Sequence, residues 1–294
     1  MKKVIFKGCA TALVTPFTQN GEKVDFKAYQ NLIDEQINAG IDALVVLGTT
    51  GEPSTMTQEE CDDVVKFAVN HINGRVPVIV GAGSNSTKQA IDKCIRYGQL
   101  GADALLVVTP YYNKCTQSGL ISHYTQIAKA TSLPIILYNV PGRTGVNLLP
   151  KTILELSKLE NIVAVKEASG NIEQISEIKR LCKDDIQVYS GDDGLTLPIL
   201  AVGGIGVISV ASNVVPKKMT QLCSTFFHGE ITRSREIQFE LNPLIKSLFL
   251  EVNPIPVKTA LSMLGKMSGT LRLPLSDMQQ DNIEKLKIEL EKFF

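Results

Sequence analysis

The chain has 294 residues, 44% of them hydrophobic and 20% charged, a composition that suits a globular protein with one large core or two modest ones. Lys plus Arg and Asp plus Glu number 30 each, so no global field recruits nucleic acid or an anionic membrane. No apolar run reaches transmembrane length, and residues 1–7 lack the apolar stretch of a signal peptide, so we expect a cytoplasmic protein.

Eight short strands are predicted along the first 210 residues. Each is a β-branched or apolar run that ends in small or polar residues. The runs cover residues 9–14, 43–47, 78–80, 104–108, 135–138, 163–166, 187–189 and 206–210.

Helices are predicted between these strands, because apolar residues recur there at helical spacing. The faces are formed by Tyr29, Leu32, Ile33 and Ile37, by Cys61, Val64, Val65 and Ala68, by Leu120, Tyr124, Ile127 and Ala128, and by Ile172, Ile175 and Ile178. Two of the helices begin with capping-box patterns, from Thr57 to Glu60 and from Ser86 to Gln89.

This alternation predicts an α/β fold with a parallel sheet, and the count of eight favours closure into a (β/α)8 TIM barrel. An open, doubly wound sheet is the structural alternative. We expect the barrel to cover residues 1–213. Residues 214–294 contain no convincing strand, so we expect a C-terminal helical extension that packs on the barrel and ends in an amphipathic helix over 283–294.

Polar side chains follow the predicted strands, and in a barrel the carboxyl ends of the strands carry the catalytic groups. Hydroxyls, phenols, one Lys and one Arg therefore converge on one rim. The segments are Gly48-Thr49-Thr50-Gly51-Glu52, Pro110-Tyr111-Tyr112-Asn113, the run from Tyr138 to Gly145 with Arg143, the run from Lys166 to Gly170, Ser190-Gly191-Asp192-Asp193, and Ile208-Ser209.

Lys166 is the most informative single residue. The period of two along the strand places Ile162, Ala164 and Lys166 on one face. Burial at the end of an apolar strand favours the neutral amine, which can attack a carbonyl carbon and form a Schiff base. The alternative is a lysine that reaches out of the rim or pairs with a carboxylate such as Glu167.

Other segments favour simpler interpretations. The glycines of 81–84 and 203–206 could hold a phosphate, but the first segment fits a strand-to-helix turn that leads into the Ser86 cap, and the second precedes strand eight at the bottom of the barrel. The pair Asp192-Asp193 could bind a cation, but without a clustered partner it is better explained as the cap of the following helix.

Cysteine and histidine do not indicate a metal or disulfide site. The six cysteines are scattered without a CxxC pair, and the three histidines lie far apart. We therefore expect no metal.

The motifs together resemble one known family. Gly48-Thr-Thr-Gly-Glu52, Tyr138-Asn-Val-Pro141, Lys166-Glu167-Ala168 and Asn253-Pro-Ile-Pro-Val-Lys258 are similar to the pyruvate-dependent class I aldolases of the dihydrodipicolinate synthase and N-acetylneuraminate lyase family. The resemblance covers essentially the whole chain. Thr49-Thr50, Thr109-Pro-Tyr-Tyr-Asn113 and Arg143 resemble the synthase branch more than the lyase branch. Arg143 stands where the synthases bind a substrate carboxylate, a role that suits a guanidinium because it binds a carboxylate in a planar, bidentate way.

The resemblance implies a reaction and its residues. Lys166 would form a Schiff base with pyruvate, and the resulting enamine would attack L-aspartate 4-semialdehyde. Tyr138 would be the acid/base, with Thr49 and Tyr112 completing a hydroxyl relay. Thr50 and the backbone at Gly191 and Ile208 would hold the pyruvate carboxylate and the surroundings of the relay. No cofactor is implied, because the imine itself accepts the electrons.

The resemblance also implies an assembly and a limit on regulation. Tyr112 would reach into the site of a neighbouring subunit, which implies at least a dimer and commonly a homotetramer built as a dimer of dimers. Lysine-inhibited members tend to carry His or Glu in two helices where this chain has Pro53, Gln58, Cys61 and Gln89. Asn85 and Tyr111 remain, yet we expect weak or no inhibition by lysine.

Two alternatives stay open at this point. The first is another pyruvate-releasing aldolase of the same family, which acts on N-acetylneuraminate or a 2-keto-3-deoxy sugar acid. Arg143 is the residue that distinguishes the synthase from this alternative. The second is a barrel that binds a keto acid as a sensor without turnover. The presence of the complete set Thr49, Tyr112, Tyr138 and Lys166 argues against this second alternative.

Overall fold

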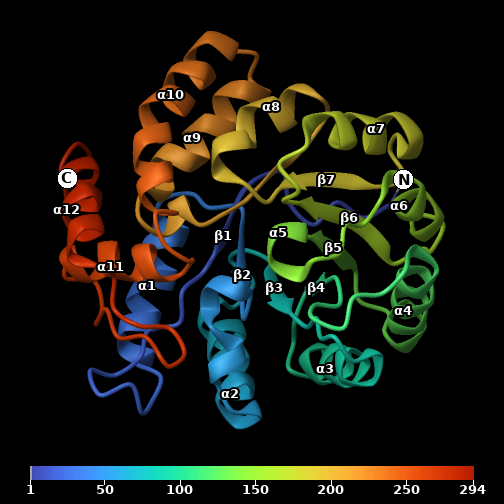
Figure 1. Ribbon diagram of the computed structural model, residues 1–294, viewed down its shortest axis with the longest axis horizontal. Helices are drawn as coiled ribbons and strands as arrows, with labels where there is room; N and C mark the ends of the chain where they lie inside the picture. The colour runs from blue at the N-terminus through green and yellow to red at the C-terminus, as the bar shows by residue number, and fades with distance from the viewer. Residues whose placement is uncertain (1) are drawn as a thin grey trace.

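Eight parallel strands, joined in sequence order into a closed ring, form the centre of the computed structural model, which describes residues 2–294 (Figure 1). They are β1 (Gly8–Ala12), β2 (Ala43–Val46), β3 (Val78–Gly81), β4 (Ala104–Val108), β5 (Ile135–Asn139), β6 (Ile162–Glu167), β7 (Gln187–Ser190) and β8 (Gly206–Ser209). Each predicted strand overlaps one of these. The pairing of β8 with β1 closes the ring, so the predicted TIM barrel is confirmed and the open sheet is excluded.

A ring of helices surrounds the barrel. It consists of α1 (Phe26–Asn38), α2 (Gln58–Ile72), α3 (Thr87–Gln99), α4 (Gln117–Ala130), α6 (Pro150–Leu156), α7 (Ile172–Cys182), α8 (Thr196–Ala201) and α9 (Pro216–Phe227). The helix α9 packs on β1 and β8 and takes the place of the eighth helix. The barrel therefore continues past residue 213, where the sequence pattern ended it, to the end of α9.

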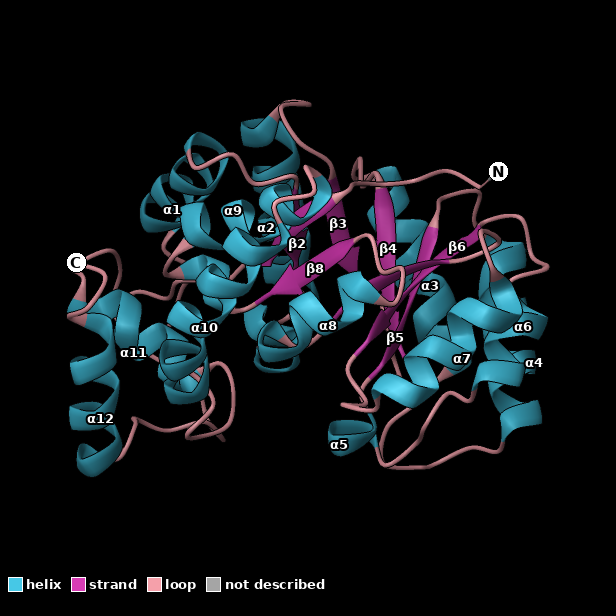
Figure 2. Cartoon of the chain, turned by 90° about the horizontal axis from the view of Figure 1, so that it is seen from above, coloured by secondary structure: helices cyan, strands magenta, loops and turns pink. Residues whose placement is uncertain are grey.

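Three further helices lie beside the ring, at the left of Figure 1: α10 (Ile231–Ser247), α11 (Ile255–Met263) and α12 (Gln280–Leu290). The helix α10 packs on α8, α9 and α12, and α12 also packs on α11. The view from above places these three helices together at one end of the molecule (Figure 2). No helix within residues 2–294 is long and apolar enough to cross a membrane.

The helix starts follow the local sequence. Thr57 and Glu60 form a complete capping box at α2, in which each side chain accepts a hydrogen bond from the backbone of the other residue. Ser86 caps α3, but Gln89 accepts a hydrogen bond from the Ser84 hydroxyl rather than from the Ser86 backbone. The second predicted box is therefore only half formed.

Two apolar clusters make up the core. The larger lies between barrel and helices, and the smaller fills the inside of the barrel with alternate residues of the strands. At the amino-terminal end of the barrel, the ring of Phe6 stacks on Tyr189 with centroids 4.2 Å apart, and the Tyr189 hydroxyl donates a 2.7 Å hydrogen bond to the Phe6 carbonyl. Phe6 and Tyr189 therefore fill the centre of the barrel at this end.

One strand departs from the expected alternation. Ile135 of β5 pairs with Ile162 of β6, but the next residue, Ile136, pairs with Ala164. Ile162 consequently belongs to the cluster outside the barrel, whereas Val163 and Ala164 both belong to the inner one. The prediction that Ile162 shares a face with Lys166 is therefore wrong, because a register shift of one residue reverses the side that a side chain faces.

The end of β3 passes very close to the end of β2. A Cβ atom on Gly81 would lie 2.0 Å from the carbonyl oxygen of Leu47 and 2.6 Å from its carbonyl carbon. Since both contacts are with backbone, no side-chain rotation can relieve them. Glycine at position 81 is what lets the two strands come together beneath the Gly48–Glu52 turn.

We therefore expect Gly81→Ala to destabilise the fold by about 1–3 kcal/mol, because the added methyl group forces the two backbones apart. Thermal unfolding would show this as a fall in Tm of several degrees, on the order of 2–4 °C per kcal/mol. The matched control is Gly142→Ala, where a Cβ meets nothing within 4 Å. Equal Tm values for the two variants would contradict the prediction.

Candidate active site

A cavity of about 430 Å³ opens at the carboxyl ends of the strands. The strand–helix loops form most of its wall, and α10 and the segment after it complete the wall. Of the residues predicted to form the site, six line this cavity: Thr49, Thr50, Tyr138, Arg143, Lys166 and Gly191. The structure therefore brings together residues that are up to 142 positions apart in the chain, as from Thr49 to Gly191.

Lys166 stands at the centre of the group. It lies near the end of β6, paired in register with Tyr138 of β5, and only 5% of its surface is exposed. Its Nζ lies 4.4 Å from the centroid of the Tyr138 ring. None of the ion pairs within residues 2–294 includes Lys166. The amine is thus held against a phenol in the cavity without a neutralising carboxylate.

Gly191 makes room for the Lys166 side chain. A Cβ atom at position 191 would lie 3.0 Å from Cε and 3.1 Å from Cγ of Lys166, and 2.8 Å from the Cβ of Ala168. Any larger residue would push the lysine stem away. The glycine after β7 therefore has a steric role toward Lys166 that the sequence pattern did not reveal.

Glu167 faces away from Lys166, to the outside of the barrel. Its buried carboxylate accepts hydrogen bonds from Asn139 Nδ2 at 3.1 Å, from the Ser169 backbone N–H at 2.7 Å and from Gln174 Nε2 at 3.2 Å. Burial raises the pKa of Glu167 despite these donors. Since Asn139 adjoins Tyr138 and Glu167 adjoins Lys166, these bonds join the ends of the two strands that carry the lysine and the phenol.

Asn253 connects two parts of the rim. Its side-chain Nδ2 donates a 3.0 Å hydrogen bond to Thr50 Oγ1, and its carbonyl accepts a 3.0 Å bond from Arg143 Nη2. Arg143 lies in the short helix α5 (Pro141–Thr144), which directly follows β5. The sequence did not predict Asn253 as a site residue. It belongs to the motif Asn253-Pro-Ile-Pro-Val-Lys258, which was the signal that could have identified it as one.

A buried ion pair between Glu52 and Lys258 lies directly after the Thr49–Thr50 turn of the rim. The Thr49–Thr50 turn is the 3-10 helix η1 (Thr49–Gly51), and Glu52 follows it with a left-handed backbone, φ 54°. The Glu52 carboxylate lies 2.6 Å from Nζ of Lys258 in α11, and both side chains are at most 1% exposed. Desolvation lowers the pKa of Lys258, and the Glu52 carboxylate opposes that shift.

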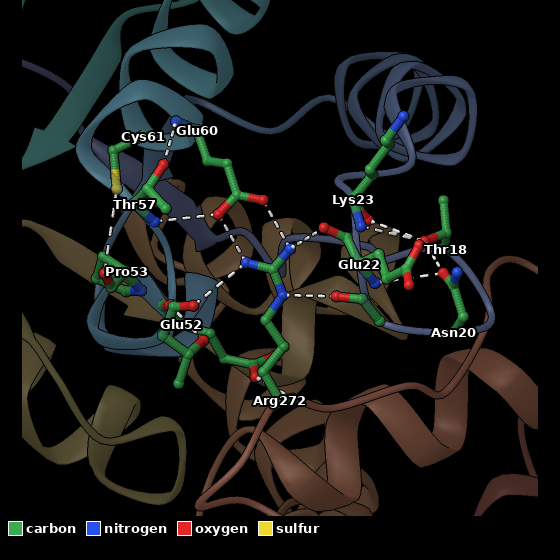
Figure 3. A network of polar contacts seen from close by, with 12 residues as sticks. Thr18, Asn20, Glu22, Lys23, Glu52, Pro53, Thr57, Glu60, Cys61 and Arg272 are labelled. Carbon is green, nitrogen blue, oxygen red and sulfur yellow. Dashed lines mark hydrogen bonds and ion pairs between the residues drawn. The ribbon is translucent and has the colours of Figure 1, made fainter.

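Arg272 extends this contact to the surface (Figure 3). Its guanidinium donates two hydrogen bonds to the Glu60 carboxylate, at 2.6 and 2.7 Å, and others to the carbonyls of Gly21 and Glu22. The Cζ atom of Arg272 and the Nζ atom of Lys258 each lie 4.2 Å from the centroid of the Phe17 ring. The C-terminal segment is thereby joined to the start of α2 and to the loop after β1.

The two aspartates after β7 have different environments. Asp192 caps the 3-10 helix η3 (Asp193–Leu195) by accepting a bond from Gly194 N–H, in line with the predicted capping role. Asp193 instead turns inward, and its Oδ2 accepts bonds from the backbone N–H groups of Val210 and Ala211 at 3.0 and 2.9 Å. Capping was therefore the wrong interpretation for Asp193, which ties the loop after β7 to the loop after β8.

Two predicted site residues do not line the cavity. Tyr112 is 90% exposed and has a positive φ of 72°, so within one chain its ring points into solvent. Ile208 is 1% exposed and packs inside the barrel, while Val210 lines the cavity in its place. The sequence analysis also missed the contribution of α10 and its end, namely Ile245, Lys246 and Phe249.

No group of three or more His, Cys, Asp or Glu side chains gathers at one point within residues 2–294. All six cysteines are free thiols, and five of them are buried. The polar side chains of the cavity are instead two amines, a guanidinium, three hydroxyls, the Asn253 amide and the Asp192 carboxylate, in which the basic groups outnumber the acidic one, a set suited to binding a carboxylate and a carbonyl group.

Known proteins resemble this chain over its full length. The sequence model that describes the dihydrodipicolinate synthetase family matches residues 5–293 of this chain. The 4-hydroxy-tetrahydrodipicolinate synthase of Alkaliphilus oremlandii is 53% identical over 288 residues, covering 98% of this chain and 99% of that protein. The crystal structure of the dihydrodipicolinate synthase of Thermotoga maritima superposes with a TM-score of 0.96 at 46% identity, over 98% and 99% of the two chains. That of the Acinetobacter baumannii enzyme, complexed with pyruvate, does so with a TM-score of 0.96 at 40% identity, over 98% of each chain.

Loss of one member of the buried ion pair should destabilise the chain strongly. We expect Glu52→Gln to cost about 3–5 kcal/mol, because it leaves the Lys258 ammonium buried without its countercharge. Thermal unfolding would report a Tm lower by about 6–20 °C. The double variant Glu52→Gln, Lys258→Met should recover part of the loss, and a single variant with the wild-type Tm would refute the expectation.

Proposed function

Because this chain belongs to the dihydrodipicolinate synthetase family, we propose that it is a lyase with 4-hydroxy-tetrahydrodipicolinate synthase activity. The reaction condenses pyruvate with L-aspartate 4-semialdehyde in the diaminopimelate route to lysine. Relatives about 50% identical over their whole length carry that name. The same evidence favours this activity over release of pyruvate from a sugar acid and over a sensor without turnover.

One observation carries the proposed chemistry. The Lys166 amine lies in the cavity beside the Tyr138 ring and has no carboxylate partner. An amine with a free lone pair attacks the ketone carbon of pyruvate, and loss of water gives an iminium ion. The positive nitrogen then withdraws electrons from the adjacent methyl group, which loses a proton to form an enamine.

The enamine carbon attacks the aldehyde carbon of the semialdehyde, and a carbon–carbon bond forms while the aldehyde oxygen takes up a proton. The amino group of the former semialdehyde then attacks the iminium carbon. This step closes the six-membered ring and expels the Lys166 amine, so the enzyme returns to its starting state. Each step needs a proton donor or acceptor close to Lys166.

We assign those proton transfers to Tyr138, with Thr49 and Tyr112 completing a hydroxyl relay. The contact of Tyr138 with the lysine amine supports its assignment, and Thr49, an exposed residue that lines the same cavity, is compatible with the relay. Thr50 and the backbone at Gly191 and Ile208 would hold the pyruvate carboxylate. Arg143 would bind the carboxylate of the semialdehyde with the guanidinium N–H groups that Asn253 leaves free.

A second subunit would complete the relay. Tyr112 projects into solvent from the loop after β4, with 90% of its surface exposed. An aromatic side chain in that state favours insertion into a partner, so we propose a dimer in which Tyr112 crosses into the neighbouring site, and a homotetramer as a dimer of such dimers. Location in the cytoplasm is likewise part of the proposal.

Borohydride trapping tests the function. We expect the chain incubated with pyruvate and sodium borohydride to gain one reduced pyruvate, and digestion followed by mass spectrometry to place it on Lys166. The Lys166→Met variant should gain none. An adduct on another lysine, or no adduct while the protein stays folded, would disprove the Schiff-base mechanism.

Removal of the Tyr138 hydroxyl tests the acid/base assignment. We expect Tyr138→Phe to lower kcat by about two to four orders of magnitude, because each proton transfer then lacks its donor and acceptor. The coupled assay with both substrates provides the measurement. Tyr29→Phe, which changes a buried tyrosine of α1 outside the cavity lining, is the control and should keep kcat within about twofold. A Tyr138→Phe variant with control-like turnover would transfer the role to another residue.

A further inference from the structure

Three basic side chains line the cavity: Lys166, Arg143 and Lys246. The first two are accounted for by the proposed function, and the third comes from the last turn of α10, outside the barrel. Only one carboxylate side chain, Asp192, lines the same cavity, and its Oδ1 already accepts the Gly194 N–H. The cavity therefore carries an excess of positive charge that the sequence pattern did not predict.

Lys246 is available to a ligand. It is exposed, and no carboxylate within residues 2–294 forms an ion pair with it. Its neighbours on the wall of the cavity are Ile245 and Phe249 of the same segment. An ammonium group beside apolar side chains at the mouth of a cavity attracts an anion that enters from solvent.

The chemistry of the reaction supplies that anion. Both proposed substrates carry a carboxylate, and once the new carbon–carbon bond has formed, both carboxylates occupy one cavity. In the proposed mechanism, the pyruvate carboxylate is tied to Lys166 through its own carbon chain and is held by Thr50, a buried residue of the cavity wall. The second carboxylate enters later and from the mouth, where Arg143 already gives one of its N–H groups to the carbonyl of Asn253.

We propose that Lys246 is a further substrate-binding residue, which holds the carboxylate of the incoming amino-acid aldehyde together with Arg143. This inference rests on the proposed function. A guanidinium fixes the plane of a carboxylate, while an ammonium on a flexible stem contributes charge without strict geometry, so the two cations complement each other. Lys246 thereby favours an anionic aldehyde over a neutral one as the acceptor of the enamine.

The last turn of a helix also favours a cation for a local reason, the partial negative charge of the helix end. That local role predicts a change in stability and none in the binding of either substrate. A substitution that raises the KM for the semialdehyde and leaves the KM for pyruvate unchanged therefore distinguishes substrate binding by Lys246 from a role in helix stability alone.

The experiment compares Lys246→Met, Lys246→Arg and the control Arg235→Met, which removes one positive charge from the exposed part of the same helix outside the cavity lining. Steady-state kinetics are measured against each substrate at low and high salt, with pyruvate trapping by borohydride and Tm in parallel. We expect Lys246→Met to raise the KM for the semialdehyde about three- to fivefold, the range of an exposed charge pair. The KM for pyruvate and the trapping yield should stay unchanged.

Lys246→Arg should restore the wild-type KM within about twofold, Arg235→Met should leave it unchanged, and the salt dependence of the KM for the semialdehyde should weaken in Lys246→Met. An unchanged KM for the semialdehyde, or an equal rise in the Arg235→Met control, would overturn the inference. A rise in the KM for pyruvate would also overturn it. If pyruvate is not trapped in the wild-type chain, the proposed function itself fails, and the premise of the inference fails with it.

Discussion

Closure of the barrel by the pairing of β8 with β1 is the constraint on which the site depends. Gly206 and Gly8 meet at this seam, where a Cβ on Gly206 would lie 2.2 Å from the Gly8 carbonyl oxygen. Once all eight strands are parallel in one ring, their carboxyl ends share a single rim. The side chains that follow the strands therefore meet at that rim, while Phe6 and Tyr189 pack inside the barrel at the other end.

The C-terminal helices complete the site. Asn253 joins Thr50 to Arg143, and Lys258 places its charge against Glu52 directly behind the Thr49–Thr50 turn. A buried ion pair adds little net stability, since desolvation of both charges offsets their attraction. Its directional contact nevertheless holds the turn and the C-terminal segment in one relative position. Asn253 and Lys258, which lie outside the barrel, thus fix the positions of Thr50, Arg143 and Glu52 at its rim.

Patterns that depend on near neighbours could be predicted. The strands, the apolar helix faces and the Thr57 cap follow from periodicity and capping chemistry, which act over a few residues. The β6 register shift at Val163, the inward turn of Asp193 and the packing of α9 on β1 could not be predicted. Each depends on the space left by a segment that is far away in sequence, so no local pattern encodes it.

The amino-acid sequence by itself determined the parallel alternation of strands and helices, the family motifs and most of the residues at the rim. Only the tertiary structure decided that Lys166 lies over Tyr138, that Gly191 leaves room for its stem, and that Glu167 faces away from it. It also decided that Lys246 joins the cavity, because α10 contributes to the wall only after it has packed beside the closed ring. Sequence periodicity acts along the chain, whereas charge and steric fit act across space, and the site is formed by the second kind of interaction.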